Sequence, residues 1–487
     1  MGHKNTEIKA INERLLRSWI RCRRKAWLDC YGDKSKKVWS AHQTLQLDHQ
    51  KLSFSAFIKG EAGVGLKGCE EGRKNVFGLK VTENTYFKNI NQSQIVLINK
   101  INGQSIWGDF AYQPVICRQG KNLTKEHKLA LAMSGVLLEK IQRFPVNKAL
   151  IISKNRKKLE INTLSLNEEI YKELFSNISK MQEELLEDNP LPLTTNRKKC
   201  SICTWRRLCD KEATSKGHLS EISGVGRKRI EMLKKIGINN IKDLSLSNSI
   251  YLENKFKIFG NQHKVIANKL INQSYAIYSG EKLKLTQNES LPEIINAPGL
   301  IIYDIESDPD IGLDFLHGFI HIKRDAKGLL DISKSEYTSL IVSNNKREDL
   351  TWERLKKVLE KNSDWPILHY GETEFLSMSR IAKRQGESEE YIATMKKRFI
   401  DIHSRVKTKW CLPINSYGLK TMANWIGFKW SGTYVDGSKA LLWWRQLRQS
   451  SKSDSYHSKN LDRILTYNKE DCIATWEVAN WLINNDI

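Results

Sequence analysis

The feature that most restricts the fold of this chain is an apolar run that ends in two acids near residue 300. Residues 300–303 are all apolar, and they are followed closely by Asp304 and Glu306. A short apolar run of this kind is consistent with a buried β-strand. Side chains two residues apart on a strand point to the same face. The sequence therefore predicts a buried strand that presents two carboxylates to one metal ion at its exposed end.

Two later segments add acids to the same part of the chain. Glu374 stands in the first turn of an expected helix, just after a short strand that ends in His-Tyr-Gly. Tyr467 and Asp471 are four residues apart on an expected C-terminal helix, and such residues share one helical face. The ordered set favours a metal site in an α/β domain.

The length of the chain limits the number of domains, and its charge indicates the kind of binding partner. At roughly 150 residues per domain, 487 residues predict a multi-domain protein, here of mixed α/β class. We expect an N-terminal α/β domain over 1–215, an all-α region over 216–280, a linker over 281–298 and an α/β domain over 299–487. The formal charge of +24 favours a polyanion, with nucleic acid as the first candidate.

Other classes of protein are disfavoured. No run approaches the roughly 18–20 apolar residues of a membrane-spanning helix, so no membrane partner is expected. The nine cysteines come without a secretory signal, which makes a disulfide framework improbable and a cytoplasmic location the default.

Three cysteines follow the spacing of metal ligands. Cys200, Cys203 and Cys209 form C-x2-C-x5-C, one thiolate short of a structural zinc site or an iron–sulfur cluster. Cys22, within an arginine-rich segment that we expect to be an amphipathic helix, is the best candidate for the fourth ligand, and Cys30 is the reserve. The spacing alone does not separate zinc from iron.

Two glycines precede a basic helix in the middle of the chain. Gly224 and Gly226 permit a tight hairpin, and a predicted helix begins at the run of Arg227, Lys228 and Arg229. Backbone amides at such a helix start, together with the basic side chains, form a phosphate site. This segment resembles a helix–hairpin–helix unit, which binds the nucleic-acid backbone, and a plain helical hairpin is the alternative.

The N-terminal part resembles the RecB-family nucleases that carry an iron–sulfur staple. The resemblance rests on a cysteine in a basic N-terminal helix followed by the distant C-x2-C-x5-C. It implies a PD-(D/E)xK-like fold and one 4Fe–4S cluster, with Zn²⁺ as the alternative. The implied ligands are Cys22, Cys200, Cys203 and Cys209.

The catalytic centre of that family is not evident in this sequence. Residues 95–99 contain no acid, and Ile116 and Arg118 stand where the family has a carboxylate and a lysine. We therefore expect a degenerate nuclease fold. A weaker hypothesis keeps residual cleavage near Asp109 and Glu126.

The C-terminal acids resemble those of the DEDD exonucleases of the tyrosine variant, within the YprB-type RNase H-like domains. The resemblance implies two Mg²⁺ or Mn²⁺ ions held by Asp304, Glu306 and Asp471. Glu374 would replace the aspartate of the second motif, and Tyr467 would orient the attacking water. Asp401, after another expected short strand, would support the site.

Two hypotheses follow from these patterns. The first is a metal-dependent nuclease, a 3′–5′ exonuclease acting on single strands or ends of DNA or RNA, whose N-terminal part binds nucleic acid. The second is a non-catalytic nucleic-acid-binding scaffold with two degenerate nuclease folds.

Overall fold

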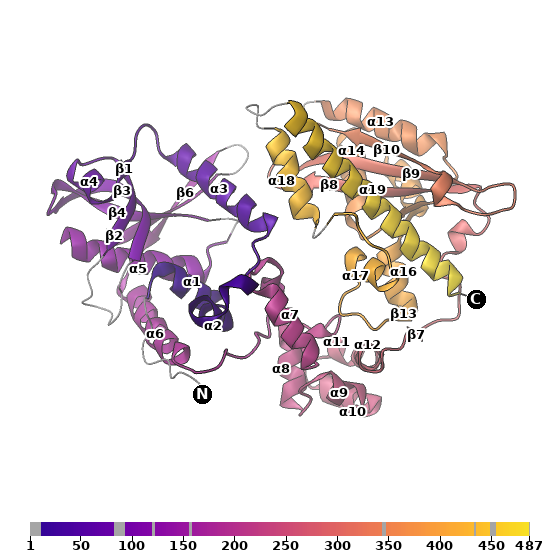
Figure 1. Ribbon diagram of the computed structural model, residues 1–487, viewed down its shortest axis with the longest axis horizontal. Coiled ribbons are helices and arrows are strands. Elements are labelled where there is room, and N and C mark those ends of the chain that lie inside the picture. The colour runs from indigo at the N-terminus through magenta and orange to yellow at the C-terminus, as the bar shows by residue number, and fades with distance from the viewer. Residues whose placement is uncertain are drawn as a thin grey trace. The chain divides into compact units, whose positions relative to one another are not determined.

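The structure is a computed structural model that describes residues 11–81, 93–118, 122–154, 158–342, 347–432, 435–448 and 454–486. The chain forms two compact units, Met1–Glu212 and Ala213–Ile487, each with its own helices and strands (Figure 1). The expectation of a multi-domain α/β protein is confirmed. Among the described residues, no helix is both long and apolar enough to cross a membrane.

The first unit is built on a mixed six-stranded sheet in the order β1-β2-β3-β4-β5-β6. Strands β2, β3 and β4 are antiparallel neighbours, β5 runs parallel to β4, and β6 returns antiparallel to β5. The strands are β1 (Gly63–Val64), β2 (Asn75–Val81), β3 (Ser93–Ser105), β4 (Gly108–Cys117), β5 (Lys148–Lys154) and β6 (Leu159–Ser165).

Helices cover this sheet and supply much of its core. The buried side chains of α1 and α5 pack in one apolar cluster with those of β2 and β3. The helices are α1 (Glu13–Arg21), α2 (Arg23–Tyr31), α3 (Ala41–Phe57), α4 (Gly65–Glu70), α5 (Lys125–Gln142) and α6 (Glu168–Leu185). Short turns η1 (Lys34–Lys36) and η2 (Arg197–Ile202) precede α7 (Arg206–Ser215).

Two local expectations for this unit are wrong. The basic N-terminal helix is two helices, because the extended backbone of Cys22 (φ −162°, ψ 114°) ends α1 and begins α2. Asn102-Gly103 is a sequence signal for a hairpin turn, but β3 and β4 are joined by a turn at residues 106–107, four residues later. The register shifts after Asn102, so Asn102 and Gly103 form an irregularity inside the hairpin.

The second unit begins with a helical region. It has one apolar cluster of its own, in which Leu219 and Leu233 are fully buried. The elements are η3 (Leu219–Glu221), α8 (Arg227–Lys235), α9 (Ile241–Ser245), α10 (Ser249–Lys257), α11 (Asn261–Lys264) and α12 (Ala267–Ser279).

The helical region is joined to the α/β part by buried polar contacts. The Gln273 side chain on α12 donates to the Leu412 carbonyl at 2.7 Å and accepts from the Tyr417 hydroxyl at 2.6 Å. The segment expected as a linker also packs against this part, because β7 (Leu283–Lys284) pairs with β13 (Trp410–Cys411) and Leu291 is buried.

A mixed five-stranded sheet forms the centre of the α/β part, in the order β10-β9-β8-β11-β12. Strand β8 is the middle strand; it runs antiparallel to β9 and parallel to β11. Apolar clusters lie on both faces, which explains the continuous apolar run at residues 300–303. The strands are β8 (Gly299–Asp308), β9 (Leu313–Lys323), β10 (Glu336–Ile341), β11 (Ile367–His369) and β12 (Phe399–Asp401).

The remaining elements surround this sheet (Figure 1). The long helix α19 packs against β8 and β9 and carries the last predicted site residues. The helices are α13 (Glu348–Lys361), α14 (Thr373–Arg384), α15 (Glu389–Arg398), α16 (Ile402–Lys409), α17 (Leu419–Trp425), α18 (Gly437–Leu447) and α19 (Asp454–Asn484). The 3-10 turns are η4 (Pro292–Ile294) and η5 (Ile332–Lys334).

Candidate metal centre

Three of the predicted carboxylates converge in the second unit. One ligand oxygen from each of Asp304, Glu306 and Asp471 lies within 4.8 Å of the other two. Asp304 and Glu306 come from the middle strand β8, and Asp471 comes from α19, so the site lies where the long helix crosses the sheet. A β-bulge directly after Glu306 locally changes the strand register beside the site.

The burial of these acids changes their protonation. Burial raises the pKa of Asp304 and of Glu306 well above the ordinary values, and the charges of Asp471 and Glu374 raise both further. Burial also raises the pKa of Asp471, to about 6, although hydrogen bonds from Tyr467 and Trp430 and the charge of Lys420 lower it. Closely spaced buried carboxylates that repel one another are a typical binding site for a divalent cation.

Glu374 faces the same site from α14 but lies outside the group of three. Its charge raises the pKa of Asp304 and of Glu306. Its Oε2 atom is buried without a hydrogen bond and lies 3.6 Å from the Nδ1 atom of His369. A buried carboxylate oxygen with no partner suits a ligand that is added from outside the chain.

Tyr467 is buried on α19 one turn before Asp471. Its hydroxyl group hydrogen-bonds the Asp471 carboxylate, and burial raises the pKa of the phenol far above its ordinary value. The side chain is therefore a neutral hydrogen-bond donor at every physiological pH. The expectation that Tyr467 and Asp471 share a helical face agrees with this contact.

Asp401 acts on the site through the turn before α14. It ends β12, and its Oδ1 atom accepts a hydrogen bond from the Gly371 amide at 2.9 Å. Gly371 has a left-handed backbone (φ +108°) in the turn that leads into α14. Asp401 thus holds the turn that brings Glu374 to the site.

Two residues that sequence reasoning missed contact the acids, and a third missed residue lies beside Tyr467. The Asn468 amide donates to Asp304 Oδ2 at 2.7 Å, and the Trp430 indole donates to Asp471 Oδ1 at 2.7 Å. The Lys420 ammonium lies 4.8 Å from the Tyr467 ring centroid. Asn468 directly follows Tyr467 on the predicted helix, whereas no sequence signal marks Trp430 or Lys420.

Lys420 places a positive charge beside the acids. Its ammonium lowers the pKa of Asp471 and of Glu306. Burial in turn lowers the pKa of Lys420, and the charges of Asp471 and Asp436 act in the opposite direction. The lysine partly offsets the repulsion among the carboxylates.

The four predicted cysteine ligands share one cavity of the first unit. Cys22, Cys200, Cys203 and Cys209 all line a cavity of about 490 Å³, and Cys30 does not. Burial raises the pKa of Cys200 to about 11, and its three cysteine neighbours raise it further while Arg197 lowers it. Within the described parts of the chain, no three of these sulfur atoms lie within 4.8 Å of one another.

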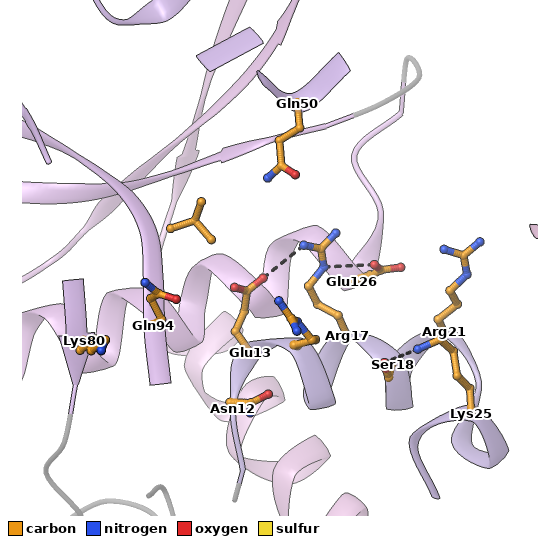
Figure 2. Close-up of a pocket in the computed structure, with 12 residues that line it drawn as sticks. Asn12, Glu13, Arg17, Ser18, Arg21, Lys25, Gln50, Lys80, Gln94 and Glu126 are labelled. Carbon is orange, nitrogen blue, oxygen red and sulfur yellow. Dashed lines mark hydrogen bonds and ion pairs between the residues drawn. The ribbon is translucent and has the colours of Figure 1, made fainter. Parts of the chain in front are cut away.

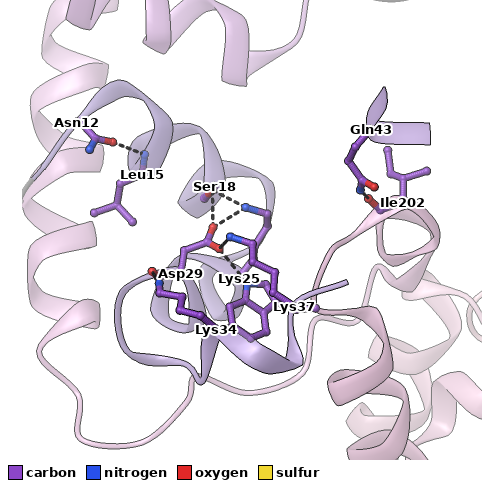
Figure 3. A network of polar contacts seen from close by, with 10 residues as sticks. Asn12, Leu15, Ser18, Lys25, Asp29, Lys34, Lys37, Gln43 and Ile202 are labelled. Atoms are coloured by element: carbon purple, nitrogen blue, oxygen red, sulfur yellow. Dashed lines mark hydrogen bonds and ion pairs between the residues drawn. The ribbon is translucent and has the colours of Figure 1, made fainter. Parts of the chain in front are cut away.

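A half-buried aspartate holds this cysteine segment against the N-terminal helices. The Asp29 carboxylate of α2 accepts hydrogen bonds from Ser18 at 2.9 Å, Lys37 at 2.9 Å and the Trp205 indole at 2.8 Å, and also pairs with Lys25 (Figure 3). Trp205 lies between Cys203 and Cys209 and is fully buried. The network brings together segments 176 positions apart in sequence.

The predicted glycine hairpin lies at the start of α8. Gly224 has a left-handed backbone (φ +89°), and Gly226 caps the helix; both glycines and Lys228 are exposed. Arg229 donates to the Gly224 carbonyl at 2.5 Å, and Arg227 pairs with Glu231 at 2.8 Å. Their contribution to binding nucleic acid stays a prediction.

The two acids of the weaker N-terminal hypothesis, Glu126 and Asp109, lie in different surroundings. Glu126 is paired with Arg17 at 3.1 Å and lines a cavity of the first unit. Asp109 is an exposed residue of β4 and does not line that cavity.

Comparison with known proteins identifies one part of the chain. A family model described as the RNase H superfamily matches residues 301–483. The C-terminal domain is therefore RNase H-like, as expected, and the family match supports nuclease-type chemistry on nucleic acid. No curated protein matches the chain.

Proposed function

We propose that this protein is a metal-dependent nuclease whose C-terminal RNase H-like domain hydrolyses phosphodiester bonds, as a 3′–5′ exonuclease on DNA or RNA. The convergence of Asp304, Glu306 and Asp471 within 4.8 Å is the observation that carries the proposal. Their buried, mutually repelling carboxylates match the donor set that Mg²⁺ and Mn²⁺ prefer.

Four acids are proposed to hold the metal ions. Asp304, Glu306 and Asp471 are the proposed ligands, and Glu374 completes the set of four acids from α14. Two divalent cations, when bound, supply a nucleophile from water and stabilise the charge on the leaving oxygen. Asn468 and Trp430 hold Asp304 and Asp471 in place through the hydrogen bonds described above.

Tyr467 and Lys420 act on the substrate side of the acids. Tyr467 stays a neutral phenol that donates to Asp471, so its hydroxyl oxygen accepts a hydrogen bond from the attacking water and orients it. Lys420 provides a positive charge for the phosphate next to the scissile bond. Electrostatic stabilisation of this kind commonly contributes several kcal/mol to catalysis.

A cavity of about 500 Å³ adjoins the site and includes Tyr467. Trp443, Lys459 and Arg463 line it, and the Arg463 guanidinium lies 5.6 Å from the Trp443 ring centroid. An aromatic ring beside cations suits the terminal base and phosphate of a strand. This cavity supports attack at the end of a strand.

We propose that the other sequence motifs support the nuclease. We propose that the hairpin of Gly224, Gly226, Arg227, Lys228 and Arg229 binds the nucleic-acid backbone, and that the first unit is a degenerate RecB-like domain that also binds nucleic acid.

We propose further that Cys22, Cys200, Cys203 and Cys209 hold a 4Fe–4S cluster. A tetrahedral zinc with bonds of about 2.3 Å needs sulfur atoms about 3.8 Å apart, and among the described residues no three of these sulfur atoms lie within 4.8 Å of one another. A four-iron cluster holds its thiolates farther apart, and Arg197 and Arg24, which line the same cavity, offset its negative charge. Zn²⁺ is the alternative.

Cleavage of end-labelled oligonucleotides tests the nuclease proposal. Single-stranded DNA and RNA labelled at the 5′ end are incubated with Mg²⁺ or Mn²⁺ and with the wild type, Asp304→Ala or Asp471→Ala. A ladder that shortens from the 3′ end and is lost in both variants supports the proposal. The exposed Asp33→Ala is the matched control. Equal inertness of all proteins with binding retained would instead support the scaffold hypothesis.

Metal analysis tests the cysteine site. Anaerobically purified protein is expected to be brown, to absorb near 400 nm, and to lose iron in Cys203→Ser. Stoichiometric zinc without iron would overturn the cluster.

A further inference from the structure

Two cavities of the first unit share one basic wall. The first, of about 540 Å³, lies among α1, β2, β3 and α5, and the second is the cysteine cavity of about 490 Å³. Arg14, Arg21 and Lys25 line both cavities, so together they form a groove along α1, which we call the α1 groove. Each cavity has the size of an ordinary ligand pocket.

The acids of the first cavity are already neutralised. Arg17 extends between Glu13 and Glu126, with its guanidinium 3.3 Å and 3.1 Å from their carboxylates (Figure 2). A cation that occupies the space between two acids removes them as ligands for a metal ion. Of the acids that the structure describes, only these two line the cavity.

The remaining charge of the α1 groove is positive and available. In the part of the chain that the structure describes, Arg14, Arg21 and Lys80 have no ion-pair partner within 4 Å. Arg14 and Lys80 are exposed, and Figure 2 shows Arg21 extending away from the Arg17 ion pairs. Unpaired cations in a groove bind an anion by releasing its counterions.

The second cavity adds one exposed aromatic ring. The sequence interleaves three tryptophans with arginines, but Trp19 and Trp27 are buried in the core. Trp39 is 61% exposed, lines the second cavity, and is anchored by a hydrogen bond from its indole to Thr44 at 3.1 Å. A fixed, exposed ring beside cations is a stacking platform for an unpaired base.

We propose that the α1 groove binds single-stranded nucleic acid, with Arg14, Arg21 and Lys80 on its phosphates and Trp39 stacked on a base. A duplex keeps its bases paired and cannot offer one to Trp39, and an anionic membrane offers no base at all. This site rests on the nucleic-acid binding proposed above for the first unit, to which it gives a location and a preference for single strands, and it does not depend on the nuclease activity.

Equilibrium binding tests the proposal on the full-length protein without added divalent cation, so that cleavage does not enter. Fluorescence anisotropy follows a labelled 20-residue oligothymidylate and the matching oligouridylate. We expect Arg14→Glu/Arg21→Glu to weaken binding about tenfold or more near 0.1 M salt. The slope of log K against log salt should fall by about 1.4, which is two contacts at roughly 0.7 each.

A second variant separates stacking from charge. Trp39→Ala should weaken binding of the single strand about fivefold or more while leaving the salt slope unchanged. The control is Lys148→Glu/Lys180→Glu, which makes the same change of charge at two exposed positions outside both cavities. Thermal melting should be alike for the variants and the control.

Several results would overturn the proposal. Arg14→Glu/Arg21→Glu could bind as the wild type does, both alone and with Lys228→Glu added to weaken the glycine hairpin. A duplex of equal length could bind as tightly as the single strand, and Trp39→Ala could leave the affinity for both unchanged. The arginine variant could lose binding to phosphatidylserine-containing vesicles while keeping the oligonucleotide. A preference between the two oligonucleotides, with both variants impaired, would support the site and show which of the two it binds more tightly.

Discussion

At the scale of the residue, the candidate site is a group of acids that the fold holds against their own repulsion. Burial and the charge of Asp471 raise the pKa of both Asp304 and Glu306. A carboxyl whose folded pKa exceeds its unfolded pKa destabilises the fold as the pH rises above the unfolded value. The site therefore lowers the stability of the metal-free protein at neutral pH.

Replacing one of these acids should separate activity from stability. Asp304→Asn removes a proposed metal ligand. The transition state then loses several kcal/mol of stabilisation by the metal, so activity should fall about a hundredfold or more. The same change removes a buried charge, so Tm of the metal-free protein should rise at pH 7. Cleavage assays and calorimetry measure the two effects. A large fall in Tm would show that Asp304 is a structural residue.

The pH dependence should depend on Lys420. Metal binding requires ionised acids, so activity should fall as the pH drops through the pKa of Asp471, about 6. Lys420 lowers the pKa of Asp471 and Glu306, and Lys420→Met should therefore move this acid limb to higher pH. Exposed Lys429→Met is the control. An unmoved limb in a variant of lower activity would mean that Lys420 acts on the substrate alone.

At the scale of the element, close approach between α19 and the β8–β9 pair builds the site. Gly318 of β9 is the partner of Asp304 across the strands. A Cβ atom on Gly318 would lie 1.7 Å from Asn468 Oδ1, the atom that accepts from the Tyr337 hydroxyl. The absent side chain therefore makes the space in which Asn468 reaches Asp304.

Filling that space should damage the site. Gly318→Ala should displace the Asn468 amide, reduce activity about tenfold or more, and weaken the response to Mg²⁺, because an ill-oriented ligand costs about 10- to 100-fold in metal affinity. Activity titrated with Mg²⁺ measures this. Gly418→Ala, whose added Cβ would meet an ordinary contact at 3.5 Å, should behave as the wild type. If activity responded to Mg²⁺ in the same way in Gly318→Ala and Gly418→Ala, the proposed role of Gly318 would be wrong.

At the scale of the whole molecule, distant segments are joined inside each unit. In the second unit, Gln273 of the helical region bonds to Leu412 and Tyr417 of the RNase H-like part. In the first unit, Asp29 joins α1, α2 and the segment that bears Cys203. Burial raises the pKa of Asp29, but Lys25, Lys37 and Trp205 together lower it far below its ordinary value.

Loss of that carboxylate should loosen the first unit. Asp29→Asn should lower the free energy of unfolding by about 2 kcal/mol, less than the 3–5 kcal/mol of a fully buried pair because Asp29 is partly exposed. Since its folded pKa is depressed, the contribution is present above the unfolded pKa near 3.9 and is lost as the pH falls further. Urea unfolding should show the difference from wild type at pH 7 shrinking below pH 4. Asp33→Asn should change stability little at either pH.

The sequence by itself determined the local chemistry of the C-terminal site. The apolar run before Asp304, the spacing of Asp304 and Glu306, and the spacing of Tyr467 and Asp471 follow from the periods of strand and helix. Those periods act over a few residues, so sequence alone reveals them. The RNase H-like class of this domain was predictable for the same reason, because its motifs lie in order along the chain.

Only the tertiary structure decided which distant groups meet. Trp430, Lys420 and Gly318 lie far from the acids in sequence and carry no local signal, yet each shapes the site through packing. The N-terminal tryptophans show the same limit, since all three follow basic residues in the sequence, yet Trp39 is exposed whereas Trp19 and Trp27 are buried. Burial and long-range contact depend on the packing of whole elements, and this is the physical reason that local spacing could not predict them.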